Sequence, residues 1–254
     1  MIKESEIQTF KNDGFVLLKD YFSKEESCNI INWASELENY PETSGKWMIY
    51  FESNGSRSRI ENILDYHNQI NELVSNKLTP LLESLIGEKM SIFKDKMNWK
   101  MANGKGFKAH QDQPAWSDFP PKRYFSIALF ANNTTVENGC LQFVKGKNNE
   151  GLYSHDINGN GELDLEIEKQ LDWNHITTTP RDLLIFDSYA PHRSYDNTTN
   201  DSRRIFYFTY NKASEGLHYY DYLKKKRIEF PPNIERVEGM KYEGKKYNLA
   251  NPIL

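Results

Sequence analysis

The stretch from which the fold is best inferred reads Ala109-His110-Gln111-Asp112-Gln113-Pro114, and Pro191-His192-Arg193-Ser194 follows much later in the chain. On an extended segment, side chains at positions i and i+2 point the same way, so His110 and Asp112 could reach one metal ion, with His192 as a third ligand. Two histidines and one carboxylate on one face of an ion leave the opposite coordination positions open, as in non-haem Fe(II) oxygenases. Because a His-x-Asp tripeptide also occurs often by chance, this interpretation depends on the rest of the chain.

The composition is that of a globular chain with a sizeable core. Its 254 residues are 38% hydrophobic and 13% aromatic, which argues against disorder and fits one domain over residues 1–254. The formal charge of −4 argues against a general nucleic-acid-binding protein, which is usually basic. Only Cys28 and Cys140 are present, so no disulfide framework is expected.

Targeting and membrane signals are not evident in the sequence. The first residues, Met1–Glu6, lack the apolar region of a secretory signal, and no stretch approaches about 18 consecutive apolar residues. We therefore expect a soluble, cytoplasmic protein that acts on a small molecule. Neither a membrane nor a nucleic acid is an expected partner, and the chain is expected to be a monomer or a homodimer.

Hydrophobic periodicity predicts helices first and short strands later, which is an α+β, mainly β arrangement. Alternating apolar and polar residues from Met90 to Met101 predict one long half-buried strand or a strand pair. Ser23 and Glu26 are spaced for a capping box, and Gly87 is the expected end of a later helix. Short strands separated by turn residues suggest a double-stranded β-helix (jelly roll, cupin-like) core flanked by N-terminal helices. Helices are expected at 4–12, 23–37, 68–86 and 215–229, and strands at 15–18, 47–51, 58–63, 90–101, 124–130, 140–144, 175–179, 183–187 and 203–210.

Several segments, matched together and in order, resemble those of one family. They are Phe10–Leu18, His110–Asp112, Gly139–Val144 with Gly146, Pro180–Phe186, His192–Ser194 and Arg203-Arg204. Through these segments the chain resembles, over nearly its whole length, the Fe(II)/2-oxoglutarate-dependent dioxygenases of the phytanoyl-CoA dioxygenase superfamily. Residues 97–102, 106–112, 209–216 and 230–232 are also similar to enzymes that hydroxylate aminoalkylphosphonates next to phosphorus.

The resemblance implies His110, Asp112 and His192 as iron ligands, with Fe(II), 2-oxoglutarate and O2 as cofactors. Related halogenases lack the carboxylate, so Asp112 points to hydroxylation or desaturation. In the family, an arginine that follows the second histidine pairs with the distal carboxylate of 2-oxoglutarate, because a guanidinium binds it through two charge-assisted hydrogen bonds. Arg203 fits this position and Arg204 is its rival. Adjacent residues of a strand point to opposite faces, so only one of the two can face the site.

Other candidate residues have structural alternatives of equal or greater weight. Ser194 could donate its hydroxyl to the same carboxylate, or it could be a plain strand-edge serine. Asn98 shares a strand face with Lys96, and that face could contact a ligand or solvent. Trp116 and Tyr124 could hold an ammonium through their aromatic faces, or they could pack in the core or a lid. The substrate-side candidates are Gln113, Trp116, Tyr124, Asp187 and Arg193, with Lys100 as a second cation for an anionic head group.

We expect hydroxylation of a C–H bond in a small polar metabolite, such as an aminoalkylphosphonate or a quaternary amine, with release of succinate and CO2. One alternative is a metal-dependent hydrolase or isomerase on a cupin-type barrel, and another is a non-catalytic sensor of iron or 2-oxoglutarate. Arg203 separates the first alternative from the oxygenase, because a hydrolase has no need of it. Residues 156–161 resemble the start of an EF-hand loop, but Ile167 stands where that loop requires Glu, so no calcium site is expected.

Overall fold

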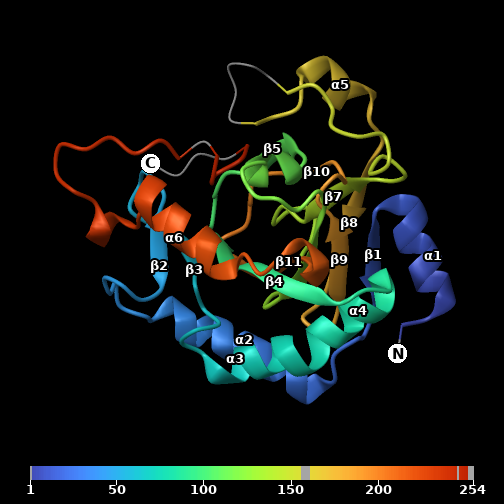
Figure 1. Ribbon diagram of the computed structural model, residues 1–254, viewed down its shortest axis with the longest axis horizontal. Helices are drawn as coiled ribbons and strands as arrows, with labels where there is room; N and C mark the ends of the chain where they lie inside the picture. Colours follow the sequence, from blue (N-terminus) through green and yellow to red (C-terminus); the bar gives the residue numbers. More distant parts are fainter. Residues whose placement is uncertain (1, 156–160, 245, 251–254) are drawn as a thin grey trace.

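Two antiparallel sheets form the centre of the computed structural model, which describes residues 2–155, 161–244 and 246–250 (Figure 1). The larger sheet has the strand order β1-β9-β6-β11-β4-β3-β2 and the smaller one β5-β10-β7-β8. Strands that are distant in the sequence are thus neighbours, as in a jelly roll, and the predicted mainly β fold class is confirmed. The strands are β1 (Phe15–Leu18), β2 (Met48–Phe51), β3 (Arg57–Glu61), β4 (Met90–Lys100), β5 (Phe107–His110), β6 (Tyr124–Phe130), β7 (Leu141–Val144), β8 (Trp173–Ile176), β9 (Leu183–Asp187), β10 (His192–Ser194) and β11 (Arg203–Lys212).

Helices from the N-terminal part of the chain cover one face of the larger sheet (Figure 1). Ala34 and Leu37 of α2 share a hydrophobic core with Phe206 and Phe208 of β11. Because strand residues alternate between faces, the neighbours of these phenylalanines in β11 point away from the helices, toward the smaller sheet. The α-helices are α1 (Glu4–Asp13), α2 (Lys24–Glu38), α3 (Asn68–Leu73), α4 (Thr79–Ile86), α5 (Leu165–Gln170) and α6 (Tyr219–Glu229).

A second, smaller core joins the two sheets. The ring of Phe143 in β7 lies 5.2 Å from that of Phe186 in β9 and 4.9 Å from that of Phe15 in β1, measured between centroids. Ala128 and Ile205 of the larger sheet belong to the same buried cluster. This apolar contact closes one end of the space between the sheets and fixes the position of β7 beside β10.

The local structures predicted by capping, turn and alternation patterns are present. Ser23 and Glu26 exchange the two hydrogen bonds of a capping box at the start of α2. Gly87 ends α4 with φ +81°, a left-handed conformation that glycine adopts without strain. The helix expected over 68–86 is α3 followed by α4, joined by the π-helical turn η1 (Val74–Leu78). The alternating run from Met90 forms a single strand, not a pair.

Other expectations were wrong in their bounds or missed an element. β8 spans Trp173–Ile176 where 175–179 was expected, and the last long helix begins at Tyr219. The short helix α5 was missed because it buries no side chain and so shows no apolar stripe. Residues 156–160, most of the segment judged not to be a calcium loop, lie outside the described residues. No helix in the described ranges combines the length and apolar character needed to cross a bilayer.

Candidate active site

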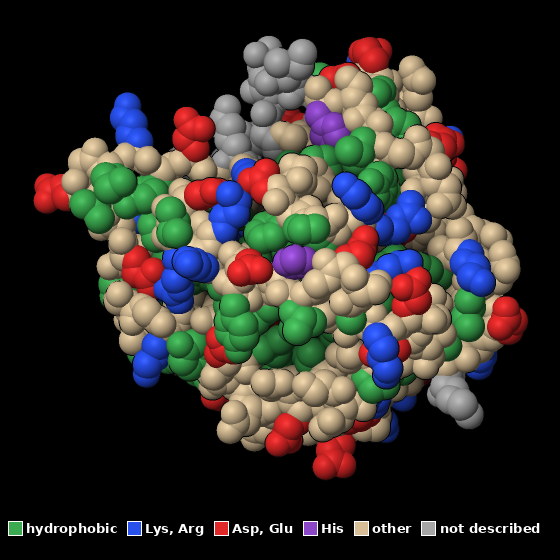
Figure 2. Space-filling model, in the orientation of Figure 1, with side chains coloured by type: hydrophobic (Ala, Val, Ile, Leu, Met, Phe, Trp, Pro, Cys, Tyr) green, Lys and Arg blue, Asp and Glu red, His purple; other side chains and the backbone are tan. Residues whose placement is uncertain are grey.

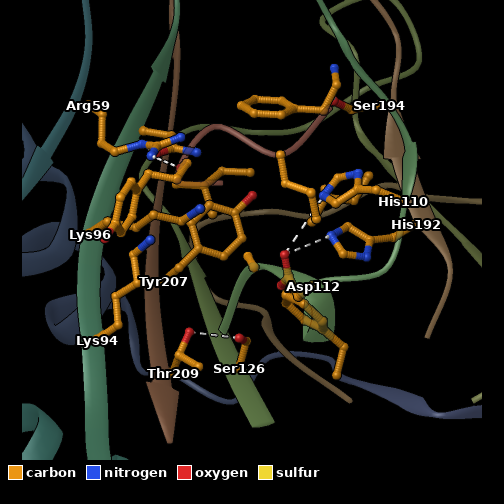
Figure 3. Close-up of a pocket in the computed structure, with 18 of the residues that line it drawn as sticks. Arg59, Lys94, Lys96, His110, Asp112, Ser126, His192, Ser194, Tyr207 and Thr209 are labelled. Carbon is orange, nitrogen blue, oxygen red and sulfur yellow. Dashed lines mark hydrogen bonds and ion pairs between the residues drawn. The ribbon is translucent and has the colours of Figure 1, made fainter. Parts of the chain in front are cut away.

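His110 and His192 face each other across two strands of the smaller sheet. They are register partners in the antiparallel pairing of β5 with β10, and their ring centroids are 4.2 Å apart. Oδ1 of Asp112 lies 3.8 Å from Nε2 of His110 and 3.9 Å from Nε2 of His192 (Figure 3). One ligand atom from each of the three residues lies within 4.8 Å of the others. The residues expected to bind a metal are therefore brought together, although they are far apart in the sequence.

Asp112 reaches this position in a different way from the one expected. β5 ends at His110, so His110 and Asp112 are not alternate residues of one strand. Asp112 has helical backbone angles and precedes the 3-10 turn η2 (Gln113–Trp116), which turns its carboxylate toward the histidines. Gln111 holds this turn, because its buried amide donates to the carbonyls of Gly151 and Tyr189 and accepts from the N–H of Tyr153. Gln111 is thus a supporting residue that the sequence did not reveal.

The hydrogen bonds of both imidazoles leave the metal-facing nitrogens free. Nδ1 of His110 lies 2.7 Å from the carbonyl oxygen of Lys108, and Nδ1 of His192 lies 3.1 Å from that of Ala190. A carbonyl can only accept, so each Nδ1 carries the proton and each Nε2 offers a lone pair. Phe143 stacks on the His192 ring at 5.3 Å and fixes its orientation. This arrangement of ligand and supporting carbonyl is the usual one at metal-binding histidines.

The electrostatics of His110 and Asp112 also fit a divalent cation. Burial, and secondarily the neighbouring His192, lower the pKa of His110 to about 3. Burial by itself would raise the pKa of Asp112, but His192, His110 and Lys96 outweigh burial and hold that pKa below its usual value. The site therefore presents a neutral His110 imidazole and an ionised carboxylate, the forms in which these groups bind metal.

A cavity between the two sheets connects this triad to a wall rich in cations. Lys94, Lys96, Asn98 and Lys100 are alternate residues of β4 and all line the cavity. The predicted polar face of this strand is thus the inner wall of the barrel. Figure 3 shows Lys94, Lys96 and Arg59 on the side opposite His110, His192 and Asp112. On the molecular face shown in Figure 2, by contrast, acidic and basic side chains are interspersed.

Arg203 and Arg204 separate as the alternation of strand residues requires. Arg203 is buried and lines the cavity, where its Nε donates to the carbonyl of Asn138 at 3.2 Å. Arg204 points to the helical side and forms an ion pair with Glu38 of α2 at 3.1 Å. Only Arg203 is therefore placed to bind a ligand in the cavity.

Ser194 and Lys100 lie in the wall of the same cavity as Arg203. Nζ of Lys100 donates to Oγ of Ser194 at 2.8 Å and to the carbonyl of Tyr195. No carboxylate pairs with Lys100 or Arg203 within the described chain. Burial, and secondarily the charge of Arg203, lowers the pKa of Lys100 to about 6. Two buried basic groups beside a hydroxyl form a site suited to a carboxylate.

A second group of cations lies nearer the middle of β4. Arg59 of β3 donates through Nε to Oδ1 of Asn98 at 3.3 Å and through Nη1 to the carbonyl of Tyr247 at 2.8 Å. Lys94 lies 3.6 Å from the buried carboxylate of Glu61. Lys96 has no hydrogen bond or ion pair within the described residues, and its Nζ lies 4.9 Å from the Tyr207 ring centroid. Arg59 and Lys94 were missed by the sequence reasoning, although the alternating lysines of β4 signalled this surface.

The residues predicted for the substrate side differ in where they lie relative to the cavity. Trp116 lines the cavity and also packs on Phe93, and Arg193, another lining residue, pairs with Glu168 at 2.6 Å. Gln113, Tyr124 and Asp187 do not line this cavity, and each has a partner within the fold. Gln113 accepts from Ser188, Tyr124 packs in the core against Trp116, and Asp187 lies 3.4 Å from Arg123.

The fold and the triad together are those of a mononuclear metal enzyme on a jelly-roll scaffold, because two histidines and one carboxylate could hold an ion and leave its other positions open. The profile of the phytanoyl-CoA dioxygenase (PhyH) family matches residues 10–205. The chain therefore belongs to the phytanoyl-CoA dioxygenase family, and the predicted class, an Fe(II)- and 2-oxoglutarate-dependent dioxygenase, is confirmed.

Individual relatives extend over almost the whole chain. A 2-aminoethylphosphonate dioxygenase from the uncultured bacterium HF130_AEPn_1 is 37% identical over 252 residues, covering 96% of this chain and 95% of the relative. A methylphosphonate hydroxylase from Gimesia maris is 34% identical and covers 90% of this chain and 88% of the relative. Among solved structures, EctD from S. alaskensis with 2-oxoglutarate and 5-hydroxyectoine superposes with a TM-score of 0.74 at 22% identity, over 85% of this chain and 78% of EctD. The structural likeness supports the fold.

Proposed function

We propose that this dioxygenase hydroxylates the C–H bond next to phosphorus in a small phosphonate, with aminoalkylphosphonates as the substrate class. The observation that carries the proposal is the position of Arg59, Lys94 and Lys96 across the cavity from the metal triad. A phosphonate head group carries up to two negative charges and three acceptor oxygens, which matches several converging cations. The two relatives named for phosphonate substrates support the same class.

A quaternary amine fits this cavity less well. Among the described residues that line it, Asp112 is the only one with a carboxylate, and this carboxylate is assigned to the metal. An ammonium would therefore face an excess of positive charge, unless the same molecule also carries a phosphonate that neutralises the cations. Trp116 and Tyr247, which also line the cavity, offer aromatic faces to the amine of an aminoalkylphosphonate.

Each group of side chains has a separate role in the proposed reaction. When bound, ferrous iron and 2-oxoglutarate supply the oxidising chemistry with O2, giving succinate, CO2 and one oxygen atom for the C–H bond. His110, Asp112 and His192 hold the metal on one face. Arg203, Lys100 and Ser194 bind the distal carboxylate of 2-oxoglutarate. Arg59, Lys94 and Lys96 hold the phosphonate so that the adjacent carbon faces the metal, which is catalysis by orientation.

A succinate assay with matched substrates tests the proposal. The panel contains 2-aminoethylphosphonate, methylphosphonate, the carboxylate and sulfonate analogues of the aminoalkylphosphonate, and a quaternary amine. We expect succinate only with the phosphonates, together with a hydroxylated product whose new oxygen comes from isotopically labelled O2. If the oxygen in the product came instead from isotopically labelled water, the hydrolase alternative would be favoured. Turnover of the quaternary amine without turnover of any phosphonate would contradict the substrate class.

We further propose that residues 1–254 act as one functional unit in the cytoplasm, as a monomer or a homodimer. Cys28 and Cys140 are both free thiols, which suits a reducing compartment. Light scattering of the purified protein at several concentrations determines the oligomeric state. A fluorescent fusion expressed in a bacterium, followed by fractionation, determines the compartment.

A further inference from the structure

A buried carboxylate, that of Glu61, lies behind the cation group of the cavity. Glu61 of β3 is completely buried. Its carboxylate accepts from the hydroxyl of Tyr222 at 2.9 Å, from Nη1 of Arg59 at 3.3 Å and from Nζ of Lys226, and it lies 3.6 Å from Nζ of Lys94. Burial alone would raise the pKa of Glu61, but Lys226, then Lys94 and Arg59, hold it well below its usual value. One anion is therefore shared among three cations.

The three cations differ in what else they face. Arg59 and Lys94 line the cavity, whereas Lys226 comes from α6 and does not. Lys226 is completely buried, and its Nζ lies 4.4 Å from the centroid of the Tyr50 ring and 5.6 Å from that of Tyr247. Its charge can act on a cavity ligand only from behind Glu61. Lys226 is thus a buried cation that the proposed reaction does not otherwise use.

We propose that Lys226 is a positioning residue that determines the charge preference of the cavity by acting through Glu61. By offsetting the charge of Glu61, Lys226 leaves Arg59 and Lys94 with positive charge that a ligand can neutralise. Without Lys226, Glu61 neutralises one of these two cations, and the cavity favours a singly charged ligand. The inference rests on the proposed function, because the ligand on which it acts is a doubly charged phosphonate.

The size of the effect depends on the charge of the ligand. A Coulomb interaction is proportional to the product of the charges, so removing one cation changes the logarithm of the affinity twice as much for a dianion as for a monoanion. Lys226→Met should therefore weaken binding of a phosphonate dianion about tenfold and binding of a monoanion about threefold. A loss of packing would weaken both ligands to the same extent.

Calorimetric titration of the full-length protein provides the test. The protein is loaded with Fe(II) and 2-oxoglutarate without O2 and titrated at alkaline pH with methylphosphonate, a dianion, and with its monomethyl ester, a monoanion. Lys226→Arg keeps the charge and should bind like the wild type. The double variant Lys226→Met with Glu61→Gln removes one charge of each sign, so its net charge equals that of the wild type and its dianion affinity should recover. Recovery distinguishes a charge effect from a packing effect.

Lys225 supplies a matched control on the same helix. It pairs with Asp118 at 3.1 Å and with Glu229, and its side chain is 31% exposed. Lys225→Met removes the same formal charge as Lys226→Met, but solvent screens it, so both affinities should stay unchanged. Thermal unfolding of every variant shows whether each one is folded at the temperature of the titration.

Three outcomes overturn the inference. These are equal weakening of both ligands in Lys226→Met, no recovery in the double variant, and a loss in Lys225→Met as large as that in Lys226→Met. If Lys226→Met does not fold, Glu61→Gln alone decides, because removing the anion must tighten dianion binding, and an unchanged or weaker affinity refutes the role. A wild-type protein that binds neither ligand would instead contradict the proposed phosphonate substrate.

Discussion

His192 lies directly opposite His110 in the pairing of β10 with β5, and this register sets the geometry of the candidate metal site. The ladder that joins the two strands holds both rings on one side of the sheet, and the turn after β5 adds the carboxylate of Asp112. A slip of one residue would turn one histidine to the opposite face of the sheet. The pairing of β5 with β10 is therefore what keeps the three candidate ligands together.

Replacing a ligand should remove iron together with activity. Asp112→Ala deletes the only carboxylate of the triad. Loss of an outer-shell partner already lowers metal affinity about 10–100-fold, so loss of a ligand itself should lower it further. Iron content after desalting and succinate formation measure the two effects. His175→Ala is the control, because His175 lies on β8 opposite Gln142, and it should retain both iron and turnover. If Asp112→Ala retained iron at the wild-type level, the triad would not be the metal site.

Arg203 and Arg204 form a matched pair of adjacent arginines with opposite expected effects. Arg203→Ala should raise the KM for 2-oxoglutarate roughly 30–150-fold, the equivalent of about 2–3 kcal/mol for a buried charged partner. Arg204→Ala should leave this KM unchanged and lower the free energy of unfolding by about 1 kcal/mol, since it breaks the Glu38 ion pair. Steady-state kinetics and urea unfolding separate the two. If Arg204→Ala alone impairs use of 2-oxoglutarate, the assignment of the two arginines is reversed.

Local patterns in the sequence were sufficient for much of the fold. Period-2 alternation predicted β4 and the 3.6-residue repeat predicted α2, because each element has one apolar face packed in the core. The pattern could not distinguish a polar face of β4 that meets solvent from one that lines an internal cavity, since polar side chains suit both. Lys96 and Asn98 were left open between these two possibilities for this reason.

Residues of the candidate site could be predicted only where they belong to a sequence motif of the family. The triad, Arg203 and Ser194 follow from resemblance to the family, whereas Arg59 and Glu61 depend on the pairing of β3 with β4, which no local pattern encodes. Tyr124 was considered for the substrate side because its aromatic ring could hold an ammonium. Its ring is fully buried against Phe93 instead, and only the tertiary fold decides that.

Lys96 should show a trade-off between stability and binding. It has no anionic partner in the described structure, and burial lowers its pKa well below the usual value. Lys96→Met removes this buried and unpaired polar group, so the ligand-free Tm should rise by a few degrees, at about 2–4 °C per kcal/mol. The KM for the phosphonate should rise about tenfold, the effect of losing about 1.4 kcal/mol of ion pairing. Calorimetric melting and steady-state kinetics measure the two effects.

Lys89→Met is the control for Lys96, because Lys89 precedes β4 and is largely exposed in an ion pair with Glu83. We expect neither the Tm nor the KM to change by more than experimental error in this variant. A lower Tm in Lys96→Met, with an unchanged KM, would show that Lys96 serves the fold and not the ligand.

Lys100 should make the stability of the ligand-free protein depend on pH. Its pKa in the folded state is about 6, lowered by burial and by Arg203, whereas that of an unfolded lysine is about 10.4. Between these values the unfolded state binds more protons, so the free energy of unfolding should rise with pH across this window. The rise is at most about 1.4 kcal/mol per pH unit. Urea unfolding between pH 6 and pH 9 measures the slope, which Lys100→Met should reduce and which Lys105→Met, at an exposed lysine, should not.

The same shift predicts that 2-oxoglutarate binding takes up a proton. At neutral pH the Lys100 amine is largely neutral, and a carboxylate placed beside it and Ser194 would restore the charged form. Titration of 2-oxoglutarate in buffers of different ionisation enthalpy should show uptake of up to about one proton per ligand at pH 7–8, and none in Lys100→Met. The affinity of that variant should fall about tenfold, since a charge-assisted hydrogen bond is lost. Uptake that persists in Lys100→Met would assign the proton to another group, and an unchanged affinity would place the cosubstrate away from Lys100.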